Sequence, residues 1–261
     1  MIRVGVVGAA GKMGRQVLAA VAAAPDLEIS CAVDPRIDEV TLDSSIVQAE
    51  DLTELPDGVA DVLVDFTRPD AARQHLAATL RRGFHLVVGT TGIGPDELRE
   101  LEAAAEASGA NAVVAANFAI GAVLLLRFAR QAAPYFDGVE IIELHHDQKL
   151  DAPSGTSIAT ANAIAEARAE AQAPELVDPT TTMVLDGARG AKAAGAVPIH
   201  SVRLPGLVAH EEVIFGAPGQ GLTLRHDSYD RISFMSGVLV AIRQVPRRSG
   251  VTVGLESLLD D

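Results

Sequence analysis

Short apolar segments alternate with helix-like segments through the first half of this chain. The apolar segments show no polar alternation, and they cover residues 2–7, 28–33, 62–66, 85–89 and 112–116. Helical patterns cover residues 11–24, 70–82, 96–108 and 120–133. Strands that are apolar on both faces are typical of a parallel sheet with helices on both sides. We therefore predict an α/β fold for this part, a Rossmann-type doubly wound parallel sheet.

The pattern changes after about residue 118, where strand-like segments dominate. They cover residues 139–145, 181–185, 199–204, 209–215 and 222–225, with one convincing helix at 156–171. This pattern predicts an α+β domain with an open mixed sheet, and residues 167–179 are predicted to be mostly a surface loop. A last helix at 232–244 is expected to return to the first domain. We therefore expect one domain of residues 1–118 and 231–261 and a second of residues 119–230.

Composition excludes several classes of function. Lys and Arg total 21 against 35 Asp and Glu, and this net charge of -14 argues against binding to nucleic acid or anionic membranes. No apolar run approaches the roughly 18 to 20 residues that cross a bilayer, and the N-terminus lacks a leader pattern, so we expect a cytoplasmic protein. The single Cys31 lies in an apolar segment and is predicted to be a buried core thiol without catalytic chemistry.

A glycine-rich loop follows the first predicted strand. It reads Gly8-Ala9-Ala10-Gly11-Lys12-Met13-Gly14 and leads into the first predicted helix. Glycine allows a pyrophosphate to approach the backbone, and the helix N-terminus stabilises its charge through free N–H groups. The spacing departs from G-x-G-x-x-G, so the position after a strand and before a helix carries the prediction of a dinucleotide site.

An acidic residue follows the second predicted strand. Asp34 stands where a carboxylate accepts hydrogen bonds from the adenosine ribose, which favours NAD over NADP. Lys12 and Arg36 are cations close enough in sequence to offset its repulsion of a 2′-phosphate. We therefore predict NADH or NADPH as cofactor, without a choice between them.

Small polar segments follow three further predicted strands. They are Phe66-Thr67, Gly89-Thr90-Thr91 and Ala115-Ala116-Asn117-Phe118. In a doubly wound sheet, ligands bind beyond the carboxyl ends of the strands, which is where these segments are expected to lie. We predict that they contact the cofactor, although ordinary turns would have similar sequences.

The segment from Glu143 to Thr156 reads ELHHDQKLDAPSGT and runs from a predicted strand to a helix start. His145, His146 and Lys149 bring positive charge and a transferable proton. Ser154, Gly155 and Thr156 bring hydroxyls and free N–H groups that suit a carboxylate. The segment therefore predicts a site for a small acidic molecule.

Each of these residues also has an ordinary structural explanation. The histidines could be surface residues at a strand end, and Ser154 or Thr156 could be a plain helix N-cap. A metal site is not predicted, because adjacent histidines on a strand point to opposite faces and no third ligand stands at suitable spacing. Arg203, His210 and Arg225 could line a pocket, but we assign them no role.

The motifs together resemble the 4-hydroxy-tetrahydrodipicolinate reductase family, also called dihydrodipicolinate reductase. The resemblance rests on the Gly8–Gly14 loop, Gly89-Thr90-Thr91, the sequence NFAIG at 117–121 and the block at 143–156, and it extends to residues 225–228 and 254–256. The block at 143–156 is highly specific, whereas the glycine loop is not. The resemblance implies reduction of a cyclic dicarboxylate by NADH or NADPH in the diaminopimelate route of lysine biosynthesis.

The resemblance also implies roles for single residues. It places His145 at the catalytic proton-transfer position and Lys149 as general acid, with His146, Gly155 and Thr156 at the substrate carboxylates. On the cofactor side it matches Gly8 to Met13, Asp34, Gly89 to Thr91 and Ala115 to Phe118. It further implies a homotetramer assembled through the sheet of the second domain, which would bind the substrate.

One departure and two rival functions remain open. Many relatives have a Glu-Arg pair after the second strand, whereas this chain has Asp34-Pro35-Arg36, which leaves the cofactor preference undecided. The first rival is a two-domain nicotinamide oxidoreductase for another amino or keto acid, and the second is a nucleotide sensor without catalysis. The presence of Lys149 and both histidines disfavours the sensor, because a sensor needs no proton donor.

Overall fold

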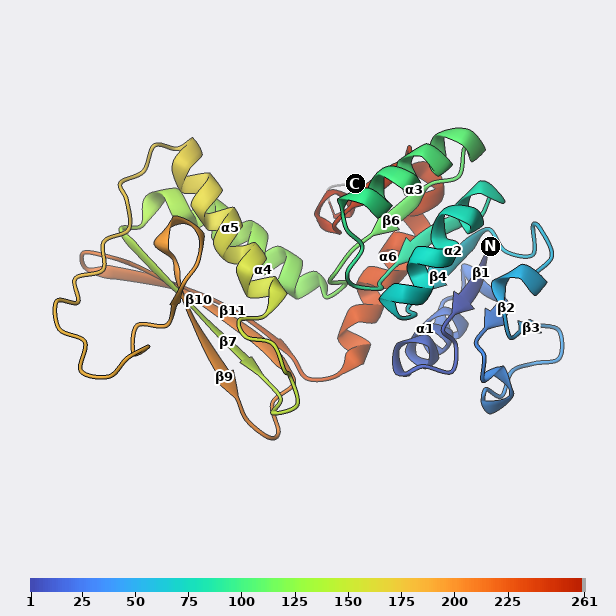
Figure 1. The fold of residues 1–261 in the computed structure, drawn as a ribbon, viewed down its shortest axis with the longest axis horizontal. Coiled ribbons are helices and arrows are strands. Elements are labelled where there is room, and N and C mark those ends of the chain that lie inside the picture. Colours follow the sequence, from blue (N-terminus) through green and yellow to red (C-terminus); the bar gives the residue numbers. More distant parts are fainter. Residues whose placement is uncertain (260–261) are drawn as a thin grey trace. The chain divides into compact units, whose positions relative to one another are not determined.

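The computed structural model describes residues 1–259 and divides the chain into two compact units (Figure 1). Unit 1 contains Met1–Ala119 together with the described residues from Arg231 onward, and unit 2 contains Ile120–Asp230. The chain therefore leaves the first unit once and returns to it.

Unit 1 is built on a seven-stranded parallel sheet in the order β12-β6-β5-β4-β1-β2-β3. The strands are β1 Ile2–Val7, β2 Leu27–Val33, β3 Val47–Ala49, β4 Val62–Asp65, β5 His85–Val88, β6 Ala112–Val114 and β12 Val251–Val253. The prediction of a doubly wound parallel sheet is confirmed. The chain order reverses direction between β1 and β4, and the carboxyl ends of strands at such a reversal are where ligands bind.

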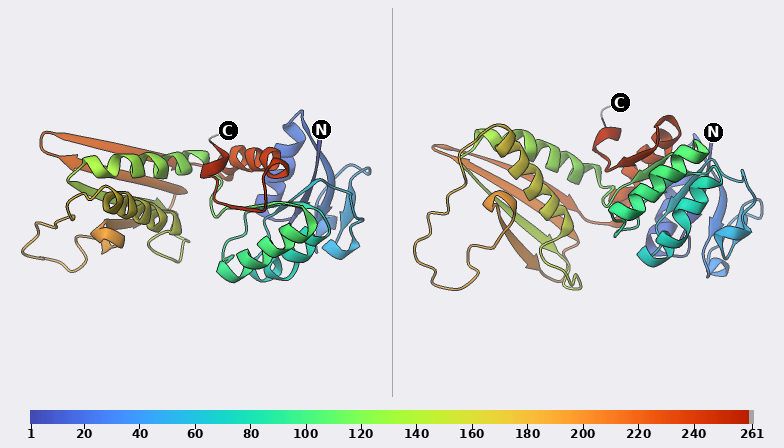
Figure 2. Two further views of the ribbon diagram at one scale, coloured as in Figure 1. Left: turned by 90° about the horizontal axis from the view of Figure 1, so that it is seen from above. Right: turned by 45° about the horizontal axis from the view of Figure 1, so that its top comes forward.

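Helices cover both faces of this sheet. They are α1 Lys12–Ala23, α2 Pro69–Arg81, α3 Pro95–Ser108 and α6 Met235–Gln244. Figure 2 shows α2 and α3 on one face and α1 and α6 on the other. Leu76 of α2 and Leu101 of α3 pack with Leu63 and Leu86 of the sheet, all nearly fully buried. Strands whose central residues are apolar on both faces thus find an apolar layer on each side, as the sequence indicates.

Unit 2 combines a mixed five-stranded sheet, in the order β11-β10-β7-β9-β8, with two helices. The elements are α4 Ile120–Ala132, β7 Gly138–His145, α5 Gly155–Glu170, β8 Ala191–Lys192, β9 Pro198–Arg203, β10 Ala209–Ala217 and β11 Gln220–Ser228. Val139 and Ile141 of β7 pack in one cluster with Leu125 of α4 and Ile164 of α5. Because side chains alternate along a strand, Glu140 and Ile142 occupy the other face.

The structure corrects two sequence-based expectations. Residues 181–185 form no strand, and Val184 and Leu185 are largely exposed. Threonine and valine are frequent in strands, so this segment has a strand-like composition, but a strand also requires a neighbouring strand with which to pair. The predicted loop at 167–179 begins too early, because α5 continues to Glu170 and Arg168 is buried there.

Two observations concern the cysteine and the possibility of a membrane span, both considered above from composition. Cys31 is fully buried in β2, as predicted, and burial raises the pKa of its thiol to about 11. Among residues 1–259, no helix combines the length and the apolar character needed to span a bilayer.

Candidate active site

The glycine loop turns tightly between β1 and α1. Gly8 has φ +83°, and a Cβ at Gly14 would lie 2.1 Å from the carbonyl oxygen of Gly8. Both positions therefore require glycine. Gly11 is the N-cap of α1 and provides no side-chain hydrogen bond to the first turn, in which Lys12 is exposed and Met13 half-buried. The loop thus leaves N–H groups of a 12-residue helix available to an anion.

Asp34 connects the end of β2 to this loop. Its carboxylate accepts hydrogen bonds from the backbone N–H of Ala10 at 3.1 Å and of Arg36 at 3.0 Å. Gly8 and Ala9 in turn donate to the carbonyl of Val33. Asp34, which is predicted to bind the ribose, is therefore joined by a hydrogen bond to the predicted phosphate-binding loop. Asp34 is only 7% exposed.

A cavity of about 610 Å³ lies beside these residues. Its lining includes Gly8, Gly11, Asp34, Phe66 and Thr67 from three strand ends of unit 1. Arg36 and Arg68 also line it, together with the carboxylates of Glu50 and Asp51. The cavity therefore has the position and size for a cofactor, with cations and acids both in its wall.

The strand ends after β4 and β5 are joined by a buried carboxylate that the sequence reasoning missed. Asp65 is 1% exposed and accepts from the Thr67 N–H at 2.9 Å, the Thr67 hydroxyl at 2.7 Å and the Thr90 hydroxyl at 2.8 Å. Its other oxygen lies 2.5 Å from His75 Nε2. Burial opposes ionisation, but these bonds outweigh it and hold the pKa of Asp65 below its ordinary value.

Thr90 is thus a buried structural partner, whereas Thr91 is exposed. Gly89 allows the Phe66 ring to lie against the backbone, because a Cβ there would be 2.0 Å from that ring.

The segment 115–118 follows β6 in unit 1. Ala115 is buried and Ala116 exposed, and Asn117 Oδ1 accepts from the Ala119 N–H at 2.9 Å. The Phe118 ring is 2% exposed and packs against Phe66 with ring centroids 5.8 Å apart. Phe118 is therefore a core residue that supports Phe66, which is itself a predicted cofactor contact.

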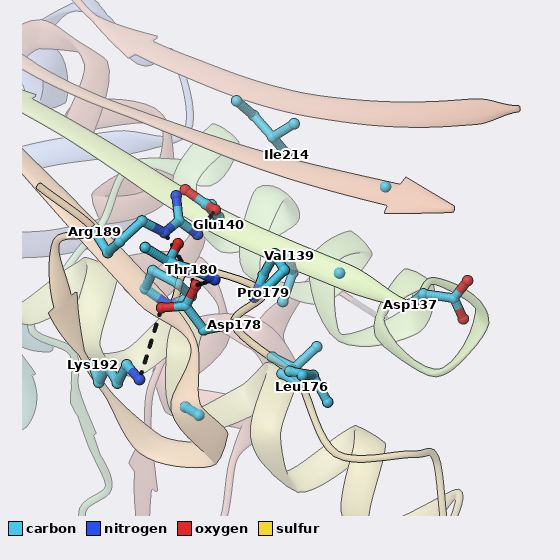
Figure 3. Close-up of a pocket in the computed structure, with 15 residues that line it drawn as sticks. Asp137, Val139, Glu140, Leu176, Asp178, Pro179, Thr180, Arg189, Lys192 and Ile214 are labelled. Atoms are coloured by element: carbon cyan, nitrogen blue, oxygen red, sulfur yellow. Dashed lines mark hydrogen bonds and ion pairs between the residues drawn. The ribbon is translucent and has the colours of Figure 1, made fainter. Parts of the chain in front are cut away.

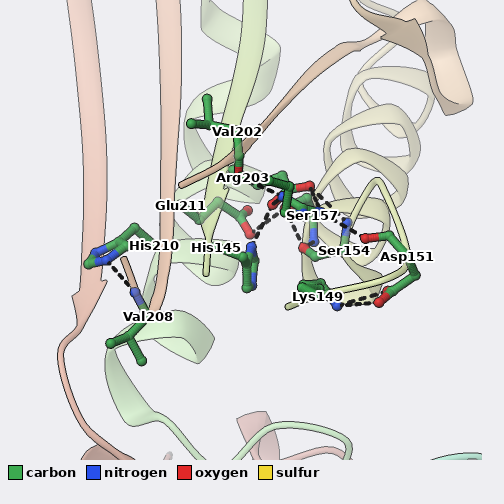
Figure 4. A network of polar contacts seen from close by, with 11 residues as sticks. His145, Lys149, Asp151, Ser154, Ser157, Val202, Arg203, Val208, His210 and Glu211 are labelled. Carbon is green, nitrogen blue, oxygen red and sulfur yellow. Dashed lines mark hydrogen bonds and ion pairs between the residues drawn. The ribbon is translucent and has the colours of Figure 1, made fainter. Parts of the chain in front are cut away.

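The second predicted site lies in unit 2, where β7 passes into a loop that leads to α5 (Figure 4). Lys149 Nζ lies 2.8 Å from both carboxylate oxygens of Asp151. His146 Nδ1 accepts from the Gln148 N–H at 3.2 Å. His145 and Lys149 are close enough that the lysine charge lowers the pKa of His145, although burial is the larger cause. The structure therefore brings the predicted imidazole and ammonium into one neighbourhood.

Ser154 begins α5 as its N-cap. The Ser154 hydroxyl accepts from the Ser157 N–H at 3.2 Å, so the structural role considered from the sequence is real. Gly155 is exposed and Thr156 half-buried in the first turn of this 16-residue helix. The predicted carboxylate-binding residues therefore form a true helix N-terminus, beside the loop of Lys149.

Two residues that the sequence reasoning left without a role lie beneath this loop. Glu143 is fully buried, and its two oxygens each lie 2.7 Å from a guanidinium nitrogen of Arg203. It also accepts from the Ser154 N–H at 3.3 Å and lies 2.5 Å from His145 Nδ1. A charged residue two positions before His145, on the same face of an apolar strand, was the available signal.

The neighbouring carboxyl on β10 has a different environment. Glu211 pairs in register with Glu143 and is 5% exposed. It accepts from the Ser157 hydroxyl at 2.9 Å, but its Oε1 has no partner among the described residues. Burial raises the pKa of Glu211, whereas Arg203, Ser201 and His145 overcome the cost of burial and lower the pKa of Glu143. The pKa values of these two adjacent buried carboxyl groups are thus shifted in opposite directions.

A second cavity lies in unit 2 and has a volume of about 650 Å³ (Figure 3). None of the predicted site residues lines it. Arg189 pairs there with Glu140 and Asp178, and Lys192 pairs with Asp178. Its cations are thus already neutralised by acids. Among residues 1–259, no cluster of three or more His, Cys, Asp or Glu side chains could hold a metal ion.

Comparisons with known proteins give one consistent result. The family model "Dihydrodipicolinate reductase, N-terminus" matches residues 2–118, and "Dihydrodipicolinate reductase, C-terminus" matches residues 121–259. Proteins named 4-hydroxy-tetrahydrodipicolinate reductase from Corynebacterium diphtheriae and Mycolicibacterium smegmatis are each 50% identical over 260 residues, covering 99% of both chains. A solved structure of dipicolinate-bound dihydrodipicolinate reductase from Paenisporosarcina sp. TG-14 has a TM-score of 0.88 and 42% identity, covering 98% of this chain and 99% of that one.

Proposed function

The chain belongs to the dihydrodipicolinate reductase family, and from that premise we propose that Lys149 supplies the proton of the reaction and that residues 145–156 bind the substrate. The reaction is the NADH- or NADPH-dependent reduction of 4-hydroxy-tetrahydrodipicolinate to tetrahydrodipicolinate in the diaminopimelate route of lysine biosynthesis. The observation that carries the proposal is the placement of the Lys149 ammonium and His145 beside the N-terminus of α5.

The residues of unit 1 fit a nicotinamide dinucleotide. Gly8 adopts a positive φ and Gly14 packs directly on the Gly8 carbonyl, so glycines shape the tight loop that a pyrophosphate could approach, and Asp34 is tied to that loop at the cavity wall. When bound, the cofactor supplies hydride. We propose that the loop from Gly8 to Met13 binds phosphate, Asp34 binds the adenosine ribose, and Phe66, Thr67 and the segments 89–91 and 115–118 contact or support the nicotinamide half.

Lys149 is suited to donate a proton. Its ammonium has three N–H donors, and the two oxygens of Asp151 can take two of them, which leaves one for a substrate atom. The side chain is 20% exposed, so it is reachable and yet partly shielded from water. The proton neutralises the negative charge that develops on the ring as hydride arrives.

The N-terminus of α5 is suited to a carboxylate. Gly155 and Thr156 present backbone N–H groups of the first helical turn, and Ser154 fixes that turn as its cap. His146 adds a ring nitrogen at the end of the same loop. We propose that these four residues bind the carboxylates of the substrate. The solved relative is described as dipicolinate-bound, and dipicolinate is a dicarboxylate.

The test is a coupled assay with full-length protein. Substrate is made in situ from pyruvate and aspartate semialdehyde, and oxidation of NADH and of NADPH is followed separately. Lys149→Ala is expected to lower kcat by about 10²- to 10⁴-fold, because a general acid contributes about that much, while the Kd of the cofactor stays unchanged. Lys192→Ala removes the other lysine of unit 2, which is 60% exposed, and should leave kcat unaffected. Full activity of Lys149→Ala would contradict the assignment.

We also propose that the protein is a homotetramer assembled through the sheet of unit 2. The sheet face opposite α4 and α5 carries the partly exposed apolar residues Ile142, Leu144 and Ile214. Apolar sheet faces pack stably against one another. Light scattering coupled to size exclusion is expected to give four times the mass of the 27.1 kDa chain, and a monomer would contradict the proposal.

A cytoplasmic location follows as a smaller proposal. A lysine-biosynthetic reductase needs a supply of reduced nicotinamide cofactor, and its one cysteine, Cys31, is a free thiol. Cell fractionation with antibody detection is expected to find the protein with cytoplasmic markers.

A further inference from the structure

We propose that Glu143 is a positioning residue that holds His145 in the Nδ1–H tautomer, so that His145 presents Nε2 as a hydrogen-bond acceptor. The inference rests on the proposed function, in which His145 belongs to the site of proton transfer. Glu143 lies on β7 and contacts His145 there, so it would act on the substrate only through that histidine.

The carboxylate of Glu143 acts only as an acceptor. It is fully buried, yet Arg203 faces both of its oxygens at 2.7 Å in a two-pronged ion pair. Such a pair stabilises the ionised form and fixes the plane of the carboxylate. A third donor, the Ser154 N–H, points at Oε1. Oε2 therefore meets His145 Nδ1 as a charged acceptor, at 2.5 Å.

An ionised carboxylate next to Nδ1 decides where the imidazole proton resides. Nδ1 must carry a hydrogen to make this contact, and in the neutral ring Nε2 then holds the lone pair. Burial lowers the pKa of His145, and the charges of Lys149 and Arg203 add to this effect, which Glu143 offsets only in part, so the neutral ring is favoured. His145 thus offers Nε2 as a hydrogen-bond acceptor, whereas Lys149 is the group that gives up the proton.

The same ion pair also holds the loop that carries Lys149. Arg203 Nη2 donates to the backbone carbonyl of Asp151 at 2.8 Å, and Asp151 is the ion-pair partner of Lys149. One buried carboxylate thus sets the ring of His145 directly and the position of Lys149 through Arg203. The charged groups that act on His145 are Glu143 on its own strand, Arg203 on β9 and Lys149 in the loop. The charge of Glu143 in turn raises the pKa of Glu211 on β10, for which burial is the larger cause.

The wild-type protein provides the most direct test. Full-length protein labelled with ¹⁵N-histidine is recorded by NMR, and the His145 signals are assigned from their loss in His145→Asn. The expected spectrum shows a protonated Nδ1 and an unprotonated Nε2 for His145 at pH 7. A spectrum with the proton on Nε2 would overturn the proposal, whatever the activity of Lys149→Ala.

Glu143→Gln tests the consequence for catalysis. One of the two carboxylate oxygens becomes an NH2 group, which cannot accept from Arg203. Where this group replaces Oε2 it donates to Nδ1 of His145 and favours the Nε2–H tautomer, so we expect a mixture of tautomers. We expect kcat/KM to fall by about 10- to 100-fold, the range known for losing the partner that orients a metal-bound histidine. Glu143 raises the pKa of His145, so its loss should also move the acidic limb of the kcat/KM profile to lower pH. A normal tautomer and an unmoved limb, even with reduced activity, would assign Glu143 a merely structural role.

Two further variants control the experiment. Glu140→Gln lies on the same strand and also removes a carboxylate paired with an arginine and a histidine, Arg189 and His200, but on the other face. It is expected to leave the His145 signals and the acidic limb unchanged. Glu143→Asp keeps the charge and should retain the Nδ1–H tautomer, which keeps the proposal testable if Glu143→Gln fails to fold.

Discussion

The two units build their polar sites by different means. In unit 1 the phosphate loop is mainly backbone: residues 8–14 form one continuous loop, shaped by glycines and tied to Asp34 by the hydrogen bond from the Ala10 N–H. In unit 2 the site depends on side chains far apart in sequence, because Arg203 reaches Glu143 across 60 residues. A local loop tolerates changes in distant residues, whereas a network of buried charges depends on each of its members.

The largest expected effect comes from breaking that network. Arg203→Met leaves Glu143 buried without its ion-pair partner, so we expect the free energy of unfolding to fall by about 3 kcal/mol, the lower end for broken buried pairs because Arg203 is itself 19% exposed. Urea unfolding would measure it. Arg225→Met removes a guanidinium that is 48% exposed from the half-buried carboxylates of Glu212 and Asp227, and it should cost far less because water can replace the lost partner. Equal losses in the two variants would contradict the expectation that the buried network around Glu143 contributes more to stability than the ion pairs of Arg225.

A smaller effect is expected when the backbone site is obstructed. In Gly14→Ala the added Cβ would lie 2.1 Å from the Gly8 carbonyl and 2.8 Å from Ala9 Cα, so the loop must shift. We expect a loss of about 1 to 3 kcal/mol in stability and weaker cofactor binding, with no change at the site of unit 2. Calorimetric titration with NADH measures the affinity. Gly216→Ala, which meets no atom within 4 Å, is the control and should bind normally.

The smallest effect concerns an exposed ion pair of unit 1. Arg243 lies 2.7 Å from Asp26, and its hydrogen bond lowers the pKa of Asp26 from 3.8 to about 2. Because the folded-state pKa is depressed, the stabilisation is present above about pH 4 and disappears as the pH falls through about 2. We expect Asp26→Asn to lower Tm slightly at neutral pH and to match the wild type near pH 2. A Tm difference that did not vary with pH would contradict this explanation.

Local patterns predicted the fold of unit 1 better than that of unit 2. The apolar segments of β1, β4 and β5 are confirmed almost to the residue, because strands buried on both faces leave an unmistakable sequence. The short strands β3 and β12 were missed, because each lies at an edge of the sheet and lacks the continuous apolar run that marks β6. The expected strand at 181–185 was wrong, since pairing is decided by neighbours that the segment itself does not reveal.

By itself, the sequence determined what depends on adjacent residues. It gave the parallel sheet, the loop at 8–14, the position of Asp34, the burial of Cys31 and the family resemblance of the block at 143–156. Only the tertiary structure decided which side chains support these motifs. Asp65 reaches Thr90 across 25 residues, and Glu143 reaches Arg203 across 60 residues, and no spacing rule connects these partners. The physical reason is that a buried carboxylate is tolerated only where folding brings its donors to it, and those donors come from strands that are neighbours in space alone.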